Sequence, residues 1–482
     1  MSIAEDGPNK LPNMSLSIII LAAGQGKRMH SDLPKVLQPL AGKPMLGYVI
    51  AAAQALVPEA IYVVYGHGGD VVKAAFSSMP LTWVLQAEQL GTGHAVQQVA
   101  PLIPDEHQVL ILYGDVPLIR EATLRRLVGS ATEQTLNLLS VDLPDASGYG
   151  RVLRDKAGSV YRIVEQKDAN RKELAVSEAN TGLMVAPARA LKRWVAGLSS
   201  ANAQHEYYLT DIIGMAAKDG FKVEALKAPT ATEVLGVNDK VQLASLEAEN
   251  RLMRARELML AGATVLDPTR LDVRGAVTVG RDVVIDVNVV FEGTVVLGDR
   301  VRIGAGCVLK DSSIASDTVL NPYSVLDSVE VGMHCILGPF ARLRPGSRVL
   351  NNAHVGNFVE LKNTTLGAGS KANHLTYLGD TVVGERVNVG AGTITCNYDG
   401  VNKWPTEIHD DAFIGSGSML VAPVTIGKNA VIGAGSTITK SAAAHALTLT
   451  RAKQQTIADW KPPVKASESE KAERIKGSRK NP

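Results

Sequence analysis

The sequence is poor in cysteine and aromatic residues, and it has no long apolar run and almost no net charge. Its three cysteines, Cys307, Cys335 and Cys396, lie far apart with no CxxC pair, which argues against a disulfide framework or a zinc knuckle and fits a reducing cytoplasm. No segment reaches the roughly 18 to 20 apolar residues that span a bilayer, so we expect a soluble protein without membrane insertion. The 50 basic and 48 acidic residues are mixed along the chain, which lacks the dense basic face that nucleic acid requires. Small molecules are therefore the expected partners.

The chain length and its changes in pattern indicate two large domains joined by a helix. A chain of 482 residues exceeds the roughly 250 to 300 residues at which single hydrophobic cores stop growing. Residues 16–238 alternate short apolar runs with amphipathic stretches, which predicts a Rossmann-like α/β domain with ligands at the strand ends. Residues 239–262 contain no proline and no internal glycine, and they predict a linker helix. The polar ends, residues 1–15 and 462–482, lack the apolar side chains that would offset the entropy of ordering, so we expect a mobile extension and a disordered tail.

A six-residue repeat dominates the second half of the chain. Because a helix repeats every 3.6 residues or so and a strand about every two, this longer period predicts a parallel β-helix over residues 263–461. The period fails between Val389 and Ile414, where the segment CNYDGVNKWPTEI is expected to project as a loop and to form a wall of a binding site. The repeating positions are Val273, Val279, Ile285, Phe291, Leu297, Ile303, Leu309, Ile314, Leu320, Leu326, Val331, Leu337, Leu343, Val349, Val355, Leu361, Leu366, Ala372, Leu378, Val383, Val389, Ile414, Leu420, Ile426, Ile432 and Ile438.

A glycine-rich turn after the first apolar run, SIIILAAG, is a candidate phosphate site. Its glycines would let the backbone approach an anion, and Arg28 and Lys35 could neutralise the charge, although a GxG turn alone is equally typical of a tight connection. Two further segments support the site: the polar run Gln86–Gly93, and Asp115 directly after the buried run VLILYG. A carboxylate at such a strand end suits Mg²⁺, and the alternative is that Asp115 caps a turn.

Several motifs of the first half together resemble a known family. They read LAAGxGxRM with a downstream PK, QLGTGHA, YGDVPL, GYGRV, IVEQKDA, NTG, EYYLTD and GVND. In this combination the chain resembles the sugar-phosphate nucleotidyltransferases, and specifically the uridylyltransferase half of the bacterial bifunctional N-acetylglucosamine-1-phosphate uridyltransferase/glucosamine-1-phosphate acetyltransferases. Lys27 stands where that family commonly has threonine, whereas the neighbouring glycines and Arg28 are intact.

The resemblance implies roles for particular residues of the first half. It implies an in-line attack of a sugar 1-phosphate on the α-phosphorus of UTP, with Arg28 and Lys35 as catalytic residues. Mg²⁺ would be held by Asp115 and Asn238. The residues implied to bind UTP or UDP-N-acetylglucosamine are Leu21, Ala22, Ala23, Gly24, Lys35, Gln86, Gly91, Thr92, Tyr113, Gly114, Asp115, Gly150, Glu165, Asn180 and Asn238, of which Gly150, Glu165 and Asn180 would lie at the sugar phosphate.

Polar residues on the later repeats argue that the β-helix is more than an assembly module. The segments ARLRPG, VELKN, KANHLTYLGD and VNVGAGTITCNYDG place basic groups, a histidine and a tyrosine on neighbouring coils. Arg344 and Lys362 suit a phosphorylated substrate, and His374 suits a general base, although a lone histidine is more commonly a surface residue. These motifs resemble the acetyltransferase half of the same bifunctional family, which implies a left-handed β-helix that forms a homotrimer with acetyl-CoA between neighbouring helices.

The same resemblance implies roles along the β-helix. His374 would be the base for attack of the glucosamine amine on the acetyl-CoA thioester, with Asn397 stabilising the oxyanion. A nucleophilic Cys396 is an alternative, but no base is evident next to it and direct transfer needs none. The residues implied for glucosamine 1-phosphate are Arg344, Lys362, Tyr377, Asn388 and Asn397, and those for acetyl-CoA are Ala391, Asn397, Tyr398, Ser416, Ala434 and Arg451.

We therefore expect a bifunctional cytoplasmic enzyme that acetylates glucosamine 1-phosphate and then transfers UMP from UTP, giving UDP-N-acetylglucosamine and pyrophosphate. In bacteria this product would serve synthesis of the cell wall, including peptidoglycan and lipopolysaccharide, and hence cell shape. Two alternatives are a single-activity pyrophosphorylase whose β-helix serves assembly or allosteric control, and a non-catalytic scaffold that binds nucleotide. The polar residues of the later repeats argue against the first, and Arg28, Lys35, Asp115 and Asn238 argue against the second.

Overall fold

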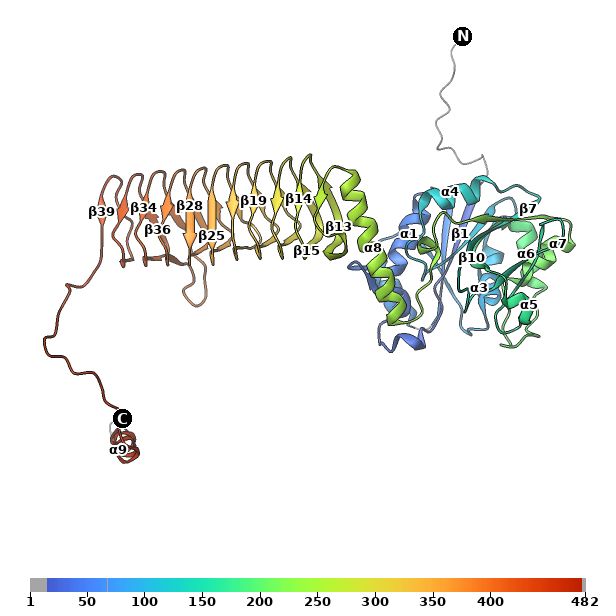
Figure 1. The fold of residues 1–482 in the computed structure, drawn as a ribbon, viewed down its shortest axis with the longest axis horizontal. Helices are drawn as coiled ribbons and strands as arrows, with labels where there is room; N and C mark the ends of the chain where they lie inside the picture. The colour runs from blue at the N-terminus through green and yellow to red at the C-terminus, as the bar shows by residue number, and fades with distance from the viewer. Residues whose placement is uncertain (1–14, 67, 479–482) are drawn as a thin grey trace, which may run out of the picture.

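The computed structural model describes residues 15–66 and 68–478, and it has two parts of different shape. A rounded α/β domain lies at one end, and a long β-helix extends from it beyond the inclined helix α8 (Figure 1). Nearly all of the predicted N-terminal extension, residues 1–14, lies outside the described residues. Within the described ranges, no helix combines the length and the apolar character needed to cross a membrane.

The α/β domain is built on a mixed sheet whose central strands are buried. β1 is parallel to both β4 and β6, and β10 runs antiparallel to β6 and β7. Ile18, Ile19 and Ile20 of β1 have no exposed surface, as expected of a strand covered on both faces. The strand order is β11 (Lys222–Lys227), β7 (Thr135–Asp142), β10 (Glu178–Pro187), β6 (Gln108–Tyr113), β1 (Leu16–Leu21), β4 (Ala60–Tyr65) and β5 (Thr82–Leu85), with β8 (Arg151–Arg154) beside β10 and β9 (Val160–Val164) beside β8.

Helices cover both faces of this sheet. Leu46 of α1 and Leu124 of α4 belong to the core on one face, and Val96 of α3, Trp194 of α6 and Ile212 of α7 belong to the core on the other. The helices are α1 (Met45–Gln54), α2 (Gly69–Ala75), α3 (Thr92–Val99), α4 (Glu121–Gly129), α5 (Arg171–Leu174), α6 (Ala188–Ala196) and α7 (Asp211–Lys218), with a small hairpin of β2 (Pro39–Leu40) and β3 (Lys43–Pro44).

Helix α8 (Lys240–Leu260) joins the two parts and packs into both. The side chain of Asp239 accepts a hydrogen bond of 2.8 Å from the backbone N of Gln242 and so caps the helix. Leu246 is buried in a cluster with residues of the α/β domain, whereas Ala255 and Leu258 belong to the core of the β-helix. The helix predicted over residues 239–262 thus completes two hydrophobic cores.

The β-helix winds through short parallel strands that stack coil on coil (Figure 1). The six-residue positions face its interior: Ile285 is fully buried, and Ile438 at the far end is 1% exposed. One sheet contains β12 (Thr264–Val265), β14 (Val284–Ile285), β16 (Arg302–Ile303), β19 (Val319–Leu320), β22 (Ile336–Leu337), β25 (His354–Asn357), β28 (Lys371–His374), β31 (Asn388–Val389), β34 (Phe413–Ile414), β37 (Val431–Ile432) and β39 (Leu447–Thr448).

The other faces of the β-helix form a longer sheet. Its strands are β13 (Leu271–Val279), β15 (Val289–Leu297), β17 (Val308–Lys310), β18 (Ser313–Ile314), β20 (Val325–Asp327), β21 (Glu330–Val331), β23 (Arg342–Leu343), β24 (Arg348–Val349), β26 (Glu360–Lys362), β27 (Thr365–Leu366), β29 (Tyr377–Gly379), β30 (Thr381–Val383), β32 (Ile394–Cys396), β33 (Thr406–Ile408), β35 (Met419–Val421), β36 (Val424–Ile426) and β38 (Thr437–Ile438).

The predicted projecting loop is shorter than the sequence suggested. Cys396 ends β32 and Thr406–Ile408 form β33, so only residues 397–405 leave the coil; they form the loop that projects from the β-helix in Figure 1. Thr395 and Ile408, each 1% exposed, fill the interior positions where the apolar period fails. The period is lost because a threonine occupies one position and an insertion separates it from the next. The Thr395 hydroxyl is satisfied by the backbone N of Gly379 at 2.8 Å.

The predicted disorder of residues 462–482 is also corrected in part. Residues Glu468–Ser478 form helix α9, away from the rest of the molecule (Figure 1). Its start is a reciprocal cap, because the Glu470 carboxylate accepts from the backbone N of Ser467 at 2.8 Å and the Ser467 hydroxyl accepts from the backbone N of Glu470 at 3.3 Å. Local capping, which composition alone does not reveal, accounts for this helix.

A buried carboxylate in the α/β domain makes stability depend on pH. Although burial opposes ionisation of Glu178, bonds from Arg154 and Ser140 and the nearby Lys227 lower its pKa to about 2. Because its pKa is lowered, the ionised Glu178 stabilises the fold fully when the pH is above 4.5, the ordinary pKa of a glutamate. This stabilisation is lost as the pH falls toward 2. We expect Glu178→Gln to lower the unfolding free energy at pH 7 by about 3 kcal/mol, and by less in acid, in urea titrations at pH 7 and pH 3. The control is Asp142→Asn, because Asp142 is an exposed partner of Lys227; this variant should change the unfolding free energy by less than about 1 kcal/mol. Equal losses of unfolding free energy in the two variants would contradict the role given to Glu178.

Candidate active sites

A cleft of about 280 Å³ opens at the carboxyl ends of β1 and β6. These strands lie in register up to Leu21 and Tyr113, so the turns that follow them are adjacent. Parallel strands bring their following turns to one edge, where α/β proteins bind ligands. The cleft is lined by Leu21, Ala22, Ala23, Gly24, Lys35, Val36, Gln86, Gln89, Gly91, Thr92, Ala95, Tyr113, Asp115 and Glu206.

The glycine-rich turn sets the position of Lys35. Gly26 has φ 63°, and a Cβ added there would lie 2.6 Å from Cβ of Lys35. Glycine therefore allows the turn to close over the lysine. The short helix that follows, Lys27–Met29, buries Met29 but leaves Arg28 exposed. Arg28 does not line the cleft, so the structure brings only Lys35 of the two predicted catalytic cations to its wall.

Lys35 and Asp115, which both line the cleft, lie close to Asn238. The Lys35 ammonium contacts Oδ2 of Asp115 and lies 3.4 Å from Oδ1 of Asn238. The backbone N of Val237 donates to the carbonyl of Asp115 at 3.0 Å, which holds the two segments together. Asp115 is therefore not a turn cap: its carboxylate binds a cation, and α4 begins after Arg120 without a side-chain cap.

Two oxygens arranged around one cation fit a Mg²⁺ site. The Lys35 ammonium touches the carboxylate and reaches the amide oxygen, so both oxygens can face one cation. Among residues 15–66 and 68–478, no group of three or more His, Cys, Asp or Glu side chains could form a metal cage. This donor set suits Mg²⁺, which takes one or two protein oxygens and completes its shell with waters and phosphates.

The predicted sugar-phosphate residues Gly150, Glu165 and Asn180 lie close to one another. The backbone N of Asn180 donates to the carbonyl of Gly150 at 2.8 Å, and Gly150 faces the carboxylate of Glu165. Burial raises the pKa of Glu165, against a hydrogen bond of 2.9 Å from the Thr210 hydroxyl. Sequence reasoning did not select Thr210, although it lies in the motif EYYLTD. The Glu165 carboxyl can accept a hydrogen bond from a sugar hydroxyl.

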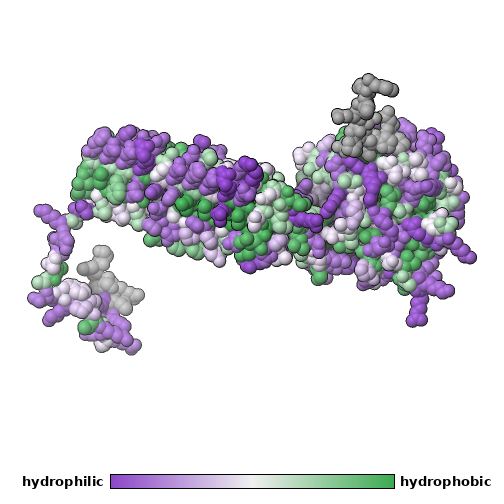
Figure 2. Space-filling model, turned by 45° about the horizontal axis from the view of Figure 1, so that its top comes forward, coloured by the Kyte–Doolittle hydropathy of each residue, from purple (hydrophilic) through white to green (hydrophobic). Residues whose placement is uncertain are grey.

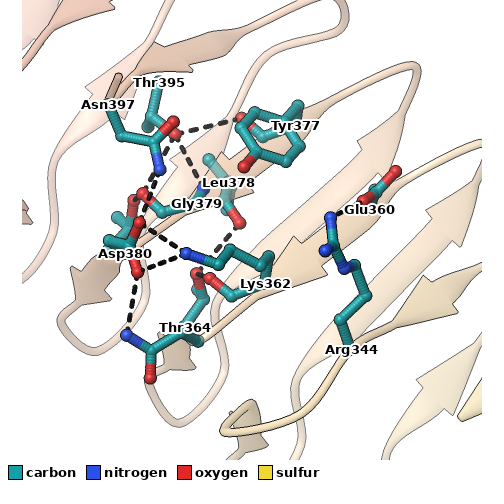
Figure 3. Close-up of polar contacts among 12 residues, drawn as sticks. Arg344, Glu360, Lys362, Thr364, Tyr377, Leu378, Gly379, Asp380, Thr395 and Asn397 are labelled. Carbon is teal, nitrogen blue, oxygen red and sulfur yellow. Dashed lines mark hydrogen bonds and ion pairs between the residues drawn. The ribbon is translucent and has the colours of Figure 1, made fainter. Parts of the chain in front are cut away.

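A second polar cluster lies on the β-helix around Asp380 (Figure 3). Lys362 Nζ lies 2.8 Å from both Asp380 oxygens, and Nδ2 atoms of Asn363 and Asn397 lie 2.9 and 2.6 Å from them. Burial alone would raise the pKa of Asp380, but these donors lower it. Arg344 forms a neighbouring pair with Glu360 at 3.0 Å. Sequence reasoning did not select Asp380, which anchors the predicted ligands Lys362 and Asn397.

Tyr377 and Asn397 approach each other over a glycine. A Cβ at Gly379 would lie 2.3 Å from the Tyr377 hydroxyl and 2.7 Å from Nδ2 of Asn397. No side chain could stand there, so glycine leaves room for the Tyr377 hydroxyl and for the Asn397 amide, which bonds to Asp380. Among the predicted sugar-phosphate ligands, Arg344, Lys362, Tyr377 and Asn397 thus share one face of the longer sheet.

His374 and Asn388 lie on the other sheet of the β-helix. Nδ1 of His374 lies 2.8 Å from Oδ1 of Asn357, its partner in the adjacent strand. With this oxygen as acceptor, Nδ1 carries the proton and Nε2 keeps a lone pair that can accept one. Asn388 pairs with Lys371 and lies one coil beyond it. No described hydrogen bond joins either residue to the cluster around Asp380.

The predicted acetyl-CoA residues form a column from His374 toward the end of the β-helix. Backbone hydrogen bonds link successive corners: Gly392 N to the His374 carbonyl at 3.3 Å, Gly417 N to the Ala391 carbonyl at 2.7 Å, and Gly435 N to the Ser416 carbonyl at 2.8 Å. Arg451 lies beside the last of these corners. Ala391, Ser416, Ala434 and Arg451 therefore follow one edge, and most of them are exposed.

The projecting loop is organised by Asp399. Its carboxylate accepts hydrogen bonds from Nε1 of Trp404 at 2.7 Å and from the backbone N of Val401 and Asn402 at 2.8 and 2.6 Å. These bonds lower its pKa to about 2, so the loop is held by a charged carboxylate over the physiological range. Tyr398, predicted for acetyl-CoA, is 60% exposed on this loop. Burial raises the pKa of the neighbouring Cys396 thiol, which argues against a thiolate nucleophile.

The chain is similar to a known protein along nearly its whole length. Residues 18–146 match the model of the MobA-like NTP transferase domain, and residues 276–311 and 405–440 match that of the bacterial transferase hexapeptide (six repeats). The bifunctional protein GlmU of Azoarcus sp. (strain BH72) is 55% identical over 450 residues, which are 93% of this chain and 100% of that protein. The chain belongs to the GlmU family. As a GlmU family member it is a bifunctional enzyme, with a nucleotidyltransferase domain and a hexapeptide-repeat transferase domain.

Among solved structures, this GlmU family member is similar to a UDP-glucose pyrophosphorylase, whose crystal structure is of its complex with UDP-glucose. That similarity has a TM-score of 0.41 and 17% identity, and it covers 49% of this chain and 98% of the other. The two alternatives of a single-activity enzyme and a non-catalytic scaffold do not fit membership of the bifunctional GlmU family.

Proposed function

We propose that this enzyme makes UDP-N-acetylglucosamine in two steps at its two sites. The β-helix transfers the acetyl group of acetyl-CoA to glucosamine 1-phosphate, and the α/β domain transfers UMP from UTP to the resulting N-acetylglucosamine 1-phosphate. The observation that carries the proposal is the presence of two separate polar clusters that each contain a lysine, one around Lys35 in the α/β domain and one around Lys362 in the β-helix. Both substrates of the first step and both of the second carry phosphate.

The uridylyl-transfer step depends on positioning and on neutralisation of charge. A phosphate oxygen of the sugar attacks the α-phosphorus of UTP in line, and pyrophosphate leaves. Lys35 turns from Asp115 to the phosphates, while Arg28, exposed on the glycine-rich turn, reaches the outer phosphates. Mg²⁺, held by Asp115 and Asn238, supplies charge neutralisation at the phosphates when bound. Glu165 and Asn180 orient the sugar.

The acetyl-transfer step depends on a base and on an anion site. Arg344 and Lys362 bind the phosphate of glucosamine 1-phosphate, and Tyr377, Asn388 and Asn397 orient the sugar. Nε2 of His374 takes a proton from the amine of glucosamine 1-phosphate as the amine nitrogen attacks the thioester carbonyl. The carbon–sulfur bond of the thioester breaks, CoA leaves as the thiolate, and the proton on His374 passes to that sulfur. A backbone or amide donor such as Asn397 stabilises the oxyanion. The column of small residues beyond His374 gives room for the CoA arm.

The direct test of the function is release of free CoA thiol. Purified protein with acetyl-CoA and glucosamine 1-phosphate should release thiol, and addition of UTP with Mg²⁺ should then release pyrophosphate. If no thiol is released by folded protein, acetyl transfer is excluded. If thiol appears without pyrophosphate, uridylyl transfer is excluded.

We also propose that the β-helix acts as a homotrimer whose acetyl-transfer site is shared between copies. The polar cluster around Asp380 lies on one sheet of the β-helix, and the hydrogen-bonded pair of His374 and Asn357 lies on the other. An interface between copies could bring the cluster of one copy next to the His374 of another. An exposed aromatic column supports self-association: Tyr323, Phe340 and Phe358 stack on successive coils, with ring centroids 5.2 and 5.4 Å apart. Their exposed fractions are 55, 47 and 56%. Hydrophobic patches also interrupt the hydrophilic surface along the β-helix in Figure 2.

Mixed trimers would test the shared site. His374→Ala and Lys362→Ala should each be inactive in acetyl transfer, but co-expressed chains should recover about a quarter of the wild-type rate, because a quarter of the interfaces then join two intact halves. The measurement is thiol release by purified mixed oligomers. Arg344→Ala mixed with Lys362→Ala damages the same half twice and should give no recovery. Absence of recovery in the first mixture would place the whole site in one chain.

The cellular setting is proposed as the bacterial cytoplasm. The cysteines of the described residues are free thiols, which fits a reducing compartment. There the product would supply peptidoglycan and lipopolysaccharide synthesis and so contribute to cell shape.

A further inference from the structure

A cavity of about 920 Å³ lies away from both candidate sites, where the α/β domain, α8 and the first coil of the β-helix meet. Its walls are the β2–β3 turn, residues 117–120, the second half of α8 and β13. The volume falls within the usual range of small-molecule sites and is more than three times the 280 Å³ of the nucleotide cleft. The parts of the chain that form it are positioned by α8, which packs into both cores.

The lining of this cavity carries an excess of positive charge. Lys43, Arg120 and Arg256 line it, and none of them forms an ion pair with another described residue. The Lys43 ammonium lies 4.9 Å from the centroid of the Tyr48 ring, so its neighbour is an aromatic face and not a carboxylate. Glu257 is the acidic side chain among the described lining residues, and it is already paired with Arg254 at 2.8 Å. Three of the lining cations are therefore not paired with a carboxylate of the described residues.

A buried amide faces the same space. Asn250 of α8 lines the cavity and is only 3% exposed, yet its side chain makes no hydrogen bond to any described residue. Its polar atoms are not fully buried, so they can hydrogen-bond to a molecule in the cavity.

We propose that this cavity is a binding site for a small molecule that carries at least two phosphate groups. The three cations come from the β2–β3 turn, the segment after β6 and α8, so separate anionic groups can each find a partner. The guanidinium groups of Arg120 and Arg256 match phosphate geometry, and the Asn250 amide fits a polar group between the phosphates. Residues 117–120 follow Asp115, and α8 follows Asn238, so the ligand contacts the continuations of both segments that carry the candidate Mg²⁺ ligands.

The proposal is tested by binding and does not depend on the proposed activity. Isothermal titration with tripolyphosphate is carried out on the full chain with Lys35→Ala and Arg344→Ala, which removes a phosphate-binding cation from each candidate active site. Binding should persist in this background. Adding Arg120→Ala with Arg256→Ala should weaken it at least about tenfold, because two charge-assisted contacts are lost. Inorganic phosphate should bind at least about tenfold more weakly than tripolyphosphate.

A matched control and a second variant complete the test. Arg171→Ala with Lys172→Ala removes two exposed charges from α5, far from the cavity, and should leave binding unchanged. If the arginine variant does not fold, Asn250→Asp places a negative charge in the same cavity and should also abolish binding. Loss of all binding in the starting background, or unchanged affinity after the cavity substitutions, would overturn the proposal.

Discussion

Lys35→Ala is expected to reduce uridylyl transfer by a factor on the order of 100 to 1,000 while leaving acetyl transfer intact. Lys35 is the cation at the wall of the nucleotide cleft that reaches both Asp115 and Asn238. Removing it leaves developing charge on the phosphates without a positioned partner. It also leaves Asp115 without its ammonium partner. The measurement is pyrophosphate release from UTP and N-acetylglucosamine 1-phosphate, beside thiol release by the same preparation.

The matched control for this result is Lys27→Thr, on the same turn. Lys27 is exposed and does not line the cleft, and threonine is the residue that the family commonly has there. We expect its rate to stay within about twofold of wild type. A Lys35→Ala protein that kept uridylyl transfer within tenfold, or that lost both activities while remaining folded, would contradict the assignment of Lys35.

His374→Ala is expected to reduce acetyl transfer by a factor on the order of 100 to 10,000, with uridylyl transfer unchanged. The hydrogen bond between Nδ1 and Oδ1 of Asn357 fixes the ring and leaves Nε2 as the proton acceptor. Thiol release from acetyl-CoA in the presence of glucosamine 1-phosphate measures the effect. Because His374 is exposed, the substitution should not disturb the β-helix core.

His354→Ala is the control on the neighbouring coil of the same sheet. His354 pairs with Lys371 one strand away, and burial lowers its pKa. It has no predicted role, so thiol release should be near normal. Equal losses in the two histidine variants would indicate that the β-helix surface, and not a base at position 374, limits the rate.

The sequence predicted the scaffold better than the contacts made on it. A six-residue period suffices to predict a β-helix, because each interior position must be small or aliphatic. Site contacts instead join residues one full coil apart: Lys362 to Asp380 across 18 positions, and His374 to Asn357 across 17. The six-residue repeat restricts only the interior positions, so it does not indicate which outward-facing residues contact each other. Asp380 and Asn357 were therefore missed, although both lie in the quoted repeats or next to them.

The α/β site was predicted unevenly for a different physical reason. A carboxylate directly after a buried strand is placed by the sheet, so Asp115 could be selected from its position. Asn238 and Glu165 come from distant segments, and only the resemblance indicated them. Thr210, which bonds to Glu165, carries no local pattern of its own.

Helix α8 has a consequence for any attempt to divide the enzyme. A chain cut before Lys240 would leave the α/β domain without Leu246, and so expose Met29, Leu40 and Met45 to water. A chain cut after Leu260 would instead deprive the β-helix of Ala255 and Leu258 at its open end. The half that keeps α8 should stay folded and the other should aggregate, so the two halves can be studied separately only if each is given its own copy of this helix.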